Sequence, residues 1–448
     1  MIIKHRVSTW VRRSAPSKHF ICYGGTGSGK DVYCLGYLQR KKGKVWDVLG
    51  FERGEGMTNS LPMDYEKFIL LGKRLTNGVY KPRGTKHEVI IIYGKKFDES
   101  FEDGTKKYKK IPKNIKICTF RCSDLDRNDW ISLLSQTKSS QILVQKMIDY
   151  LYDEKGMKTL NIDIIIDLID KIINKTHPEF KEKFYSTHAM TMGVVKSNLI
   201  IIKNSGIFDE RFEHIDLEES YQNQDTMTTV SCYFADSDIE KAVTAGLILK
   251  KIYDMQTSKK YIEDNYIFLR ELHIPYKKVL KEEADIYTLL KNYVYKVLTE
   301  GRQSKIWIVA NTQNTLQIPD YIRQHFRKVF SFSQNRKGIE ALQEYGYIDP
   351  VTLKKLLKAK KFIGINIIDG EYDYPCYTLP PTFKTKAAGE GVWDLLLTKF
   401  GGIDRSNYNI DTINNNNKTI NNNISKNNNL ESSPTSLSNS EKPPYSAL

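Results

Sequence analysis

Short apolar runs alternate with longer, helix-patterned stretches between residues 15 and 400. Runs of roughly four to eight residues rich in isoleucine, valine, tyrosine and phenylalanine are typical of buried strands. Strands that alternate with helices indicate an α/β domain with a largely parallel sheet. We expect strands at 19–24, 44–50, 88–94, 114–120, 228–234, 266–272, 305–311, 328–333 and 361–368.

Two regions depart from this alternation. The stretch 124–220 is long and has a helical pattern, with polar residues between its apolar positions. This pattern predicts a helical insertion or lid subdomain. Residues 401–448 are rich in asparagine and serine and have little to bury, so we expect a disordered tail. A segment that folds on contact with a partner is the alternative. The predicted organisation is therefore a basic N-terminal arm at 1–16, a main domain at 17–400 with the insertion at 124–220, and the tail.

Composition narrows the class of protein, its compartment and the kind of partner it would bind. The 448 residues are 40% hydrophobic, which suits a globular body, and no apolar run reaches the roughly 18 residues that a membrane span needs. The N-terminus shows no export signal, and the six cysteines form no C-x-x-C pair, so we expect a soluble protein in a reducing cytoplasm, the host's if the chain is viral. The net charge of +15 suits a polyanionic partner. Because residues 401–448 contain equal numbers of basic and acidic side chains, this excess belongs to residues 1–400.

The first chemical signal is the sequence FICYGGTGSGKD at 20–31, which has the pattern G-x-x-x-x-G-K between a predicted strand and a predicted helix. Glycines let the chain curl around a phosphate so that backbone N–H groups point inward, and the lysine reaches the β- and γ-phosphates. The pattern predicts a nucleotide-binding phosphate loop made of Gly24, Gly25, Thr26, Gly27, Ser28, Gly29 and Lys30.

One position departs from this pattern. A serine or threonine that ligates Mg²⁺ is expected after the lysine, and here the residue is Asp31. A carboxylate is also a suitable oxygen ligand for Mg²⁺, but it brings negative charge towards the phosphates. We therefore expect ATP and Mg²⁺ as ligands, Asp31 as the metal contact, and a compensating cation nearby.

An ATPase of the additional-strand class needs a second strand that ends in an acid able to activate water. The stretch 277–287 offers Glu282 and Glu283, but its lysines make it a poor strand. The stretch 265–275 is the better candidate, because four apolar residues lead directly to Arg270 and Glu271. Glu271 then occupies the position of a catalytic glutamate, whereas an arginine stands where an acid is usual. We interpret His273 as a structural contact.

Three segments together resemble the HerA/FtsK superfamily of DNA-pumping ATPases. They are SKHFICYGGTGSGKD at 17–31, YIFLRELHIP at 266–275, and the stretch 299–333 with its Gly-Arg, its strand ending in Thr-Gln and its proline segment. The resemblance covers roughly 17–385 and is specific at these three motifs. It implies a P-loop NTPase core of the RecA-like additional-strand class, with a mainly parallel sheet flanked by helices, in the domain at 17–400.

The resemblance also implies roles for single residues. Glu271 would polarise the attacking water, and Gln313 would sense the γ-phosphate and link hydrolysis to movement. Arg302 would act as an arginine finger in the neighbouring subunit's site. A surface arginine in a turn remains the alternative for Arg302. Asp31 and Arg270 would both lie beside the metal, which suggests that the carboxylate has moved across the site and that Arg270 balances Asp31 or a phosphate.

The function that the resemblance implies is ATP-driven movement of double-stranded DNA by a homo-oligomeric ring, with six subunits as the expected number. Genome packaging, with portal or capsid partners, or plasmid transfer, with a relaxase, is favoured over chromosome repair, because the phosphate-loop strand starts at residue 19 and leaves no room for an N-terminal barrel. The lysine-rich stretch 93–116 and the arm at 4–14 are candidate DNA contacts. A nucleotide-binding scaffold that has lost hydrolysis, and a filamentous-phage-type assembly ATPase, are the alternatives.

Overall fold

The computed structural model describes most of the predicted main domain. The described residues are 18–49, 62–94, 97, 110–112, 115–135, 138–174, 189–210, 212–232, 234–258, 263–276, 286–313, 315–359, 363–368, 371–372, 376–383 and 402–404. The chain divides into two units, Met1–Ile403 and Asp404–Leu448, and the main sheet belongs to the first. The predicted arm at 1–16 and, apart from 402–404, the predicted tail lie outside the described residues.

All nine predicted strands are present. The strands are β1 (Phe20–Tyr23), β2 (Lys44–Leu49), β3 (Lys86–Ile92), β4 (Lys110–Pro112), β5 (Ile115–Cys118), β6 (Thr226–Ser231), β7 (Asn265–Leu269), β8 (Ile306–Thr312), β9 (Lys328–Phe332), β10 (Ile363–Ile368), β11 (Glu371–Tyr372), β12 (Cys376–Tyr377) and β13 (Gly402–Asp404). The prediction for 266–272 was too long, because β7 ends at Leu269 and a turn follows.

The sheet places β1, which leads to the phosphate loop, beside β8, which leads to Gln313. Within the described residues the order is β11-β10-β9-β1-β8-β7-β2-β6-β3-β5, with β12 paired to β10. The run from β9 to β5 is parallel, and β10, β11 and β12 pair antiparallel at one edge. Strand β8 therefore lies between β1 and β7, and because all three are parallel their carboxyl ends lie at the same edge of the sheet.

Helices cover both faces of the sheet. The α-helices are α1 (Lys30–Leu38), α2 (Glu66–Leu75), α4 (Arg127–Leu134), α5 (Lys138–Asp149), α6 (Ile162–Ile173), α8 (Ala189–Ser205), α9 (Leu217–Gln222), α10 (Asp238–Thr257), α11 (Thr288–Ser304), α12 (Asp320–Arg323), α13 (Arg336–Glu344) and α14 (Pro350–Leu357). Short helical turns are η3 (Cys122–Asp124), η4 (Tyr150–Glu154), η5 (Ile274–Tyr276) and η6 (Thr315–Gln317). No helix within the described ranges is long and apolar enough to cross a membrane.

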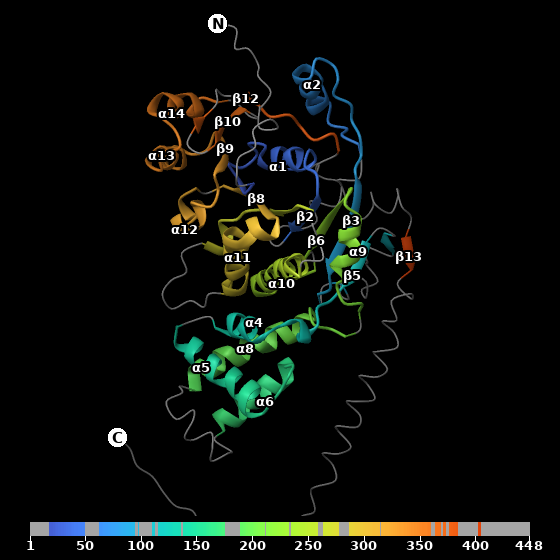
Figure 1. The fold of residues 1–448 in the computed structure, drawn as a ribbon, viewed down its shortest axis with the longest axis vertical. Coiled ribbons are helices and arrows are strands. Elements are labelled where there is room, and N and C mark those ends of the chain that lie inside the picture. The colour runs from blue at the N-terminus through green and yellow to red at the C-terminus, as the bar shows by residue number, and fades with distance from the viewer. Residues whose placement is uncertain are drawn as a thin grey trace, which may run out of the picture. The chain divides into compact units, whose positions relative to one another are not determined.

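Alternation along the central strands explains the two layers. In β1, Phe20 and Cys22 pack with α1, whereas Ile21 and Tyr23 belong to the larger core on the opposite face, which α10 and α11 cover (Figure 1). Successive side chains of a strand point to opposite faces, so a fully apolar strand is stable only when both faces are covered. The burial of β1, β7 and β8 at every position has this cause.

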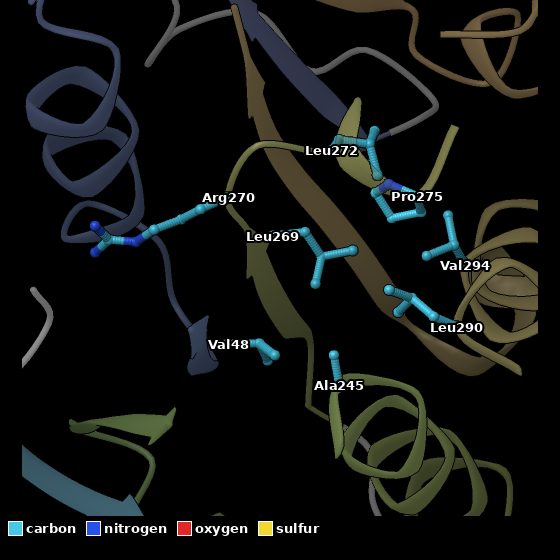
Figure 2. Close-up of a pocket in the computed structure, with 8 residues that line it drawn as sticks. All are labelled: Val48, Ala245, Leu269, Arg270, Leu272, Pro275, Leu290 and Val294. Carbon is cyan, nitrogen blue, oxygen red and sulfur yellow. The ribbon is translucent and has the colours of Figure 1, made fainter. Parts of the chain in front are cut away.

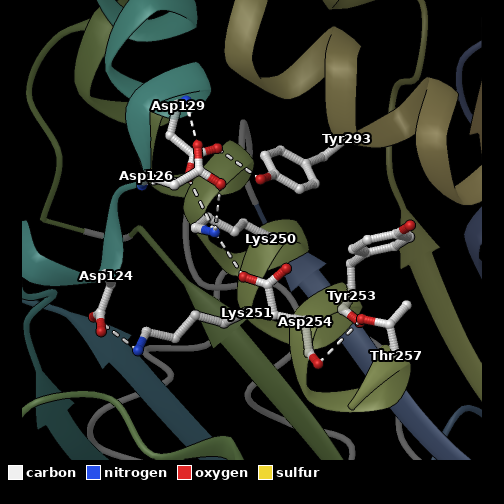
Figure 3. Close-up of polar contacts among 9 residues, drawn as sticks. All are labelled: Asp124, Asp126, Asp129, Lys250, Lys251, Tyr253, Asp254, Thr257 and Tyr293. Atoms are coloured by element: carbon white, nitrogen blue, oxygen red, sulfur yellow. Dashed lines mark hydrogen bonds and ion pairs between the residues drawn. The ribbon is translucent and has the colours of Figure 1, made fainter. Parts of the chain in front are cut away.

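The region between β5 and β6 is helical in its described residues, and it is tied to the core by a buried ionic contact. Lys250 of α10 lies 3.0 Å from Asp129 of α4 and 2.6 Å from Asp254, and the Tyr293 hydroxyl of α11 donates to Asp129 over 2.6 Å (Figure 3). The side chains of Lys250 and Asp129 are only 7% and 3% exposed. The contact therefore fixes α4 against α10 and α11. That residues 124–220 form an insertion of their own stays a prediction.

Candidate functional site

The phosphate loop lies between β1 and α1, as the sequence predicts. Gly27 and Gly29 adopt φ angles of 70° and 105°, in the left-handed region that favours glycine, and α1 begins directly at Lys30. The loop is attached at both sides, because the Gly24 N–H donates to Thr312 at the end of β8 and the Gly25 N–H donates to Ser333 after β9. Its position is thus determined by the two strands that flank β1.

The loop has the shape of a cradle for phosphates. A Cβ atom on Gly24 would lie 2.6 Å from the Ser28 hydroxyl oxygen and 2.9 Å from Cβ of Phe332, so the close curl requires glycine there. Lys30 is 5% exposed, and its Nζ donates to the Gly25 carbonyl over 3.2 Å. The ammonium group therefore already lies across the loop, and these residues fit the triphosphate of a nucleotide.

The predicted catalytic glutamate lies beside this loop, and a chain of side chains connects the two. Gln313 donates through Nε2 to Oε1 of Glu271 over 2.7 Å, and Gln313 Oε1 accepts from the Thr26 hydroxyl over 2.9 Å. Nδ1 of His273 lies 3.2 Å from Oε2 of Glu271 and 3.1 Å from the Thr312 hydroxyl. The structure thus brings Glu271, Gln313 and the phosphate loop together, and it adds His273, which we interpreted as a structural contact.

The surroundings of Glu271 keep its carboxylate ionised. Burial acts to raise the pKa of Glu271, but contacts with His273 and Gln313 and the charge of Lys30 outweigh it, so the pKa lies below its ordinary value. An ionised carboxylate is the form that accepts a proton from water. The backbone at Glu271 has φ of 50°, an unusual value for a residue with a side chain, and it directs the carboxylate out of the line of β7.

Asp31 lies on the first turn of α1, next to the phosphate loop. Asn311, near the end of β8, donates through Nδ2 to Oδ1 of Asp31, and its Oδ1 accepts from the Glu271 N–H over 2.6 Å. Among the described residues, no group of three or more His, Cys, Asp or Glu is placed to hold a metal ion. Mg²⁺ at nucleotide sites commonly uses one or two carboxylates and completes its shell with phosphates and water, so Asp31 beside the loop fits this ion.

The partner of Arg270 differs from our prediction. Arg270 Nε and Nη2 donate to the two carboxylate oxygens of Asp47 on β2, over 3.2 and 3.0 Å, and both side chains are almost fully buried. Asp47 pairs in register with Phe268 of β7, two residues before Arg270, so both side chains share the α1 face of the sheet. Figure 2 shows Arg270 directed away from the apolar side chains around Leu269 and Leu272. The acid that neutralises Arg270 in a two-bond pair is therefore Asp47, and an exchange of charge with Asp31 is not needed.

Arg302 lies far from the phosphate loop of its own chain. It is exposed in the last turn of α11, and β8 starts four residues later at Ile306. The loop lies at the other end of β8, roughly 20 Å away for a strand of this length. The geometry is compatible with action in another subunit's site, which stays a prediction.

The candidate DNA contacts are described only in small part. Lys116, from the stretch 93–116, lies 3.1 Å from Glu88 and 2.9 Å from Glu219, so neighbouring acids balance its charge. Most of the other lysines of that stretch, the arm at 4–14 and the rival acids Glu282 and Glu283 lie outside the described residues.

Sequence reasoning missed two residues of the site, Asn311 and Asp47. Both interrupt an otherwise apolar strand, in KIWIVAN and KVWDVLG, and both are fully buried. A polar side chain in such a strand needs a hydrogen-bonding partner, and a buried acid needs a cation. The signal was therefore present, but the strand pattern alone did not identify the partners.

The fold and the site define a P-loop NTPase core of the additional-strand class, because β8 separates the phosphate-loop strand β1 from β7, the strand that leads to Glu271. No protein-family model matches the chain, and no curated protein sequence matches it. Among solved structures it is similar to VirB4 of Thermoanaerobacter pseudethanolicus, with a TM-score of 0.50 and 11% identity over 85% of this chain and 92% of that one. At this identity the similarity concerns the fold, and it agrees with the mainly parallel, helix-flanked sheet that the motifs predict.

Two further solved structures are similar at lower TM-scores. The plasmid coupling protein TrwB in complex with GDPNP has a TM-score of 0.49 and 11% identity, over 86% of this chain and 93% of that one. The genome packaging NTPase B204 of Sulfolobus turreted icosahedral virus 2, in complex with ATP-γS, has a TM-score of 0.33 and 9% identity, over 82% of this chain and all of that one. At these identities the similarity concerns the fold.

Proposed function

We propose that this protein hydrolyses ATP and uses the energy to move double-stranded DNA, as a ring of identical subunits. The observation on which the proposal rests is the hydrogen-bonded chain from Thr26 of the phosphate loop through Gln313 to Glu271. This hydrogen-bonded chain supports the proposal, because Glu271 would activate the attacking water, Gln313 would respond to the γ-phosphate, and the loop beside them would hold the phosphates. These are the parts that phosphoryl transfer to water requires.

Each part has a distinct task in the proposed reaction. The loop N–H groups and Lys30 bind the phosphates, and Glu271 accepts a proton from the attacking water. Asp31 is the chain's own ligand for Mg²⁺, which supplies charge neutralisation on the phosphates when it is bound. Gln313 touches both the loop and Glu271, so loss of the γ-phosphate changes its contacts. Because Gln313 directly follows β8, that change reaches the central strand of the sheet.

The DNA partner is supported by the motif resemblance and by charge. The excess of positive charge lies within residues 1–400, the part of the chain that contains the motor core. Basic surfaces bind the DNA backbone with an affinity that falls as salt rises. Genome packaging or plasmid transfer is the finer proposal, with a portal, capsid or relaxase component as partner.

The proposal is tested by measuring ATP hydrolysis with and without double-stranded DNA, at two salt concentrations. We expect DNA to stimulate hydrolysis at low salt and to lose this effect as salt rises. Lys30→Ala should abolish hydrolysis by weakening nucleotide binding, whereas Glu271→Gln should bind the nucleotide and hydrolyse it at least about a hundred-fold more slowly. Unchanged hydrolysis in Glu271→Gln would contradict the assigned site.

The scaffold alternative is favoured by one observation, the acid at position 31 in place of a hydroxyl residue. It predicts tight nucleotide binding that Lys30→Ala removes, together with no hydrolysis by the wild type in the presence or absence of DNA. The same experiment therefore separates a motor from a nucleotide-dependent scaffold.

A further inference from the structure

We propose that Asn311 is a positioning residue that holds the metal-side acid Asp31 and the turn bearing Glu271 as one unit. The inference rests on the proposed function, because it concerns how Asp31 and Glu271 of that site are held in position relative to each other. Asn311 would not touch the nucleotide. It would act through its two neighbours, and it would link the occupancy of the site near Asp31 to the orientation of Glu271.

Asn311 is placed between the two acids by the order of the strands. It lies on β8, opposite Cys22 of β1 in the parallel register, and it is completely buried. Asn311 follows Val309 by two residues, so both side chains point to the same face of the sheet, and Val309 packs in the core that contains α1. Asp31 approaches from α1, and Glu271 approaches from the end of β7 on the other side of β8.

Three hydrogen bonds connect Asn311 with these neighbours. Its Oδ1 accepts from the Glu271 N–H over 2.6 Å, its backbone carbonyl accepts from the Leu272 N–H over 2.9 Å, and its Nδ2 donates to Asp31. Two consecutive N–H groups of the turn after β7 are thus bound to one residue. Because Glu271 has the left-handed φ of 50°, its turn persists only where the surroundings hold it, and Asn311 provides two of these contacts.

The amide side chain of Asn311 suits both neighbours, the Glu271 N–H and the Asp31 carboxylate. A backbone N–H can only donate, so it requires the Oδ1 oxygen, and an ionised carboxylate can only accept, so it requires the NH₂ group. The two contacts together determine which way the amide points. Aspartate at this position could accept from the Glu271 N–H but would repel the Asp31 carboxylate. Alanine could form neither hydrogen bond.

The first test compares Asn311→Ala with Asn265→Ala. Asn265 is a matched control, because it is also a fully buried strand asparagine. Its amide oxygen accepts from Trp46 and its amide nitrogen donates to Gln256, but it lies at the start of β7, away from the phosphate loop. We expect Asn311→Ala to lower kcat about ten-fold or more with KM for ATP changed less than about three-fold, since a misplaced Glu271 affects the transition state.

The second readout needs no turnover. We expect Asn311→Ala to raise the Mg²⁺ concentration at half-maximal binding of a fluorescent non-hydrolysable ATP analogue by about three-fold or more, because Asp31 loses the group that orients it. Asn265→Ala should leave that concentration unchanged. If the two variants lose activity in proportion to their loss of thermal stability, and neither changes the Mg²⁺ dependence, Asn311 is only structural.

A reciprocal exchange keeps the inference testable if Asn311→Ala fails to fold. Asn311→Asp alone sets two carboxylates together and should lower Tm in the absence of Mg²⁺ and nucleotide. Adding Asp31→Asn restores a donor and acceptor pair, so the double variant should melt about 2 °C or more above Asn311→Asp. A double variant that melts at or below Asn311→Asp would overturn the link. Both the melting and the binding measurements remain valid if the wild type hydrolyses no ATP, so failure of the proposed function is distinguishable.

Discussion

At the scale of single residues, the site depends on how buried polar groups are neutralised. The neighbours of Glu271 lower its pKa and so favour its ionised form. Arg270 is paired with Asp47 through two buried hydrogen bonds. Breaking such a pair by removing one member commonly costs about 3 to 5 kcal/mol, because the other charge stays buried. If the carboxylate had moved across the site, Asp31→Thr combined with Arg270→Asp would recover the hydrolysis that each change alone impairs. We do not expect this recovery, because Arg270→Asp places a second carboxylate against Asp47.

If the Glu271 carboxylate accepts a proton from the attacking water, as we propose, the pH dependence of hydrolysis should report the environment of Glu271. Because its folded-state pKa is depressed, the carboxylate is ionised above that pKa, and activity is lost as pH falls through it. His273→Ala removes a contact that lowers the pKa, so we expect the acid limb of the kcat/KM profile to move to higher pH. The measurement is a steady-state pH profile of both proteins. A lower activity with an unshifted acid limb would show that His273 does not act on Glu271.

At the scale of elements, the phosphate loop and helix α4 are attached to the rest of the fold in different ways. The phosphate loop is bonded to the ends of β8 and β9, so it is anchored to the sheet and not only to α1. Helix α4 is attached to α10 and α11 through the buried ionic cluster around Lys250, through apolar packing, and through a hydrogen bond from Asn292 to Ser132. The ionic cluster is the part of this attachment that a single substitution can remove.

The Lys250 cluster predicts a large loss of stability from one substitution. Lys250→Met leaves Asp129 buried without its cation, and we expect the free energy of unfolding to fall by about 3 to 5 kcal/mol. The neighbouring pair of Lys251 and Asp124, at 2.8 Å and about a quarter exposed, is a matched control (Figure 3). Lys251→Met should cost less than about 1 kcal/mol. Urea unfolding of the three proteins measures both values, and equal losses would contradict the assignment of the buried contact.

At the scale of the whole molecule, one chain does not bring Arg302 to the rest of the proposed site. Arg302 lies at the edge of the sheet where β8 begins, and the phosphate loop lies where β8 ends. An arginine that neutralises charge on the transferring phosphoryl group must reach that group directly. If Arg302 has this role, it acts on a neighbouring subunit, and the active form is an oligomer.

Mixing of variants tests this arrangement. Arg302→Ala and Lys30→Ala should each lose hydrolysis alone. In a mixed ring, a Lys30-containing site can receive an intact arginine from the neighbouring Lys30→Ala subunit, so we expect part of the activity to return. Arg302→Lys is the control for the charge, and it should recover less than wild type because it lacks the planar two-bond geometry. No recovery in verified mixed oligomers would count against the arginine finger.

The sequence by itself determined the features that depend on residues close together in the chain. The phosphate loop was predictable because its glycines and Lys30 lie within one short segment, and the nine strands were predictable because apolar runs report burial directly. Glu271 followed from its place after an apolar run, and the sheet class followed from the alternation of elements.

Only the tertiary structure decided which distant residues meet. Arg270 and Asp47 are 223 residues apart, and Asn311 and Asp31 are 280 apart. Their pairing depends on the order of strands, which places β7 beside β2 and β8 beside β1. A buried charge or amide in a sequence shows that a partner is needed, but hydrogen bonds between neighbouring strands select that partner, and these bonds leave little trace in the residues on either side.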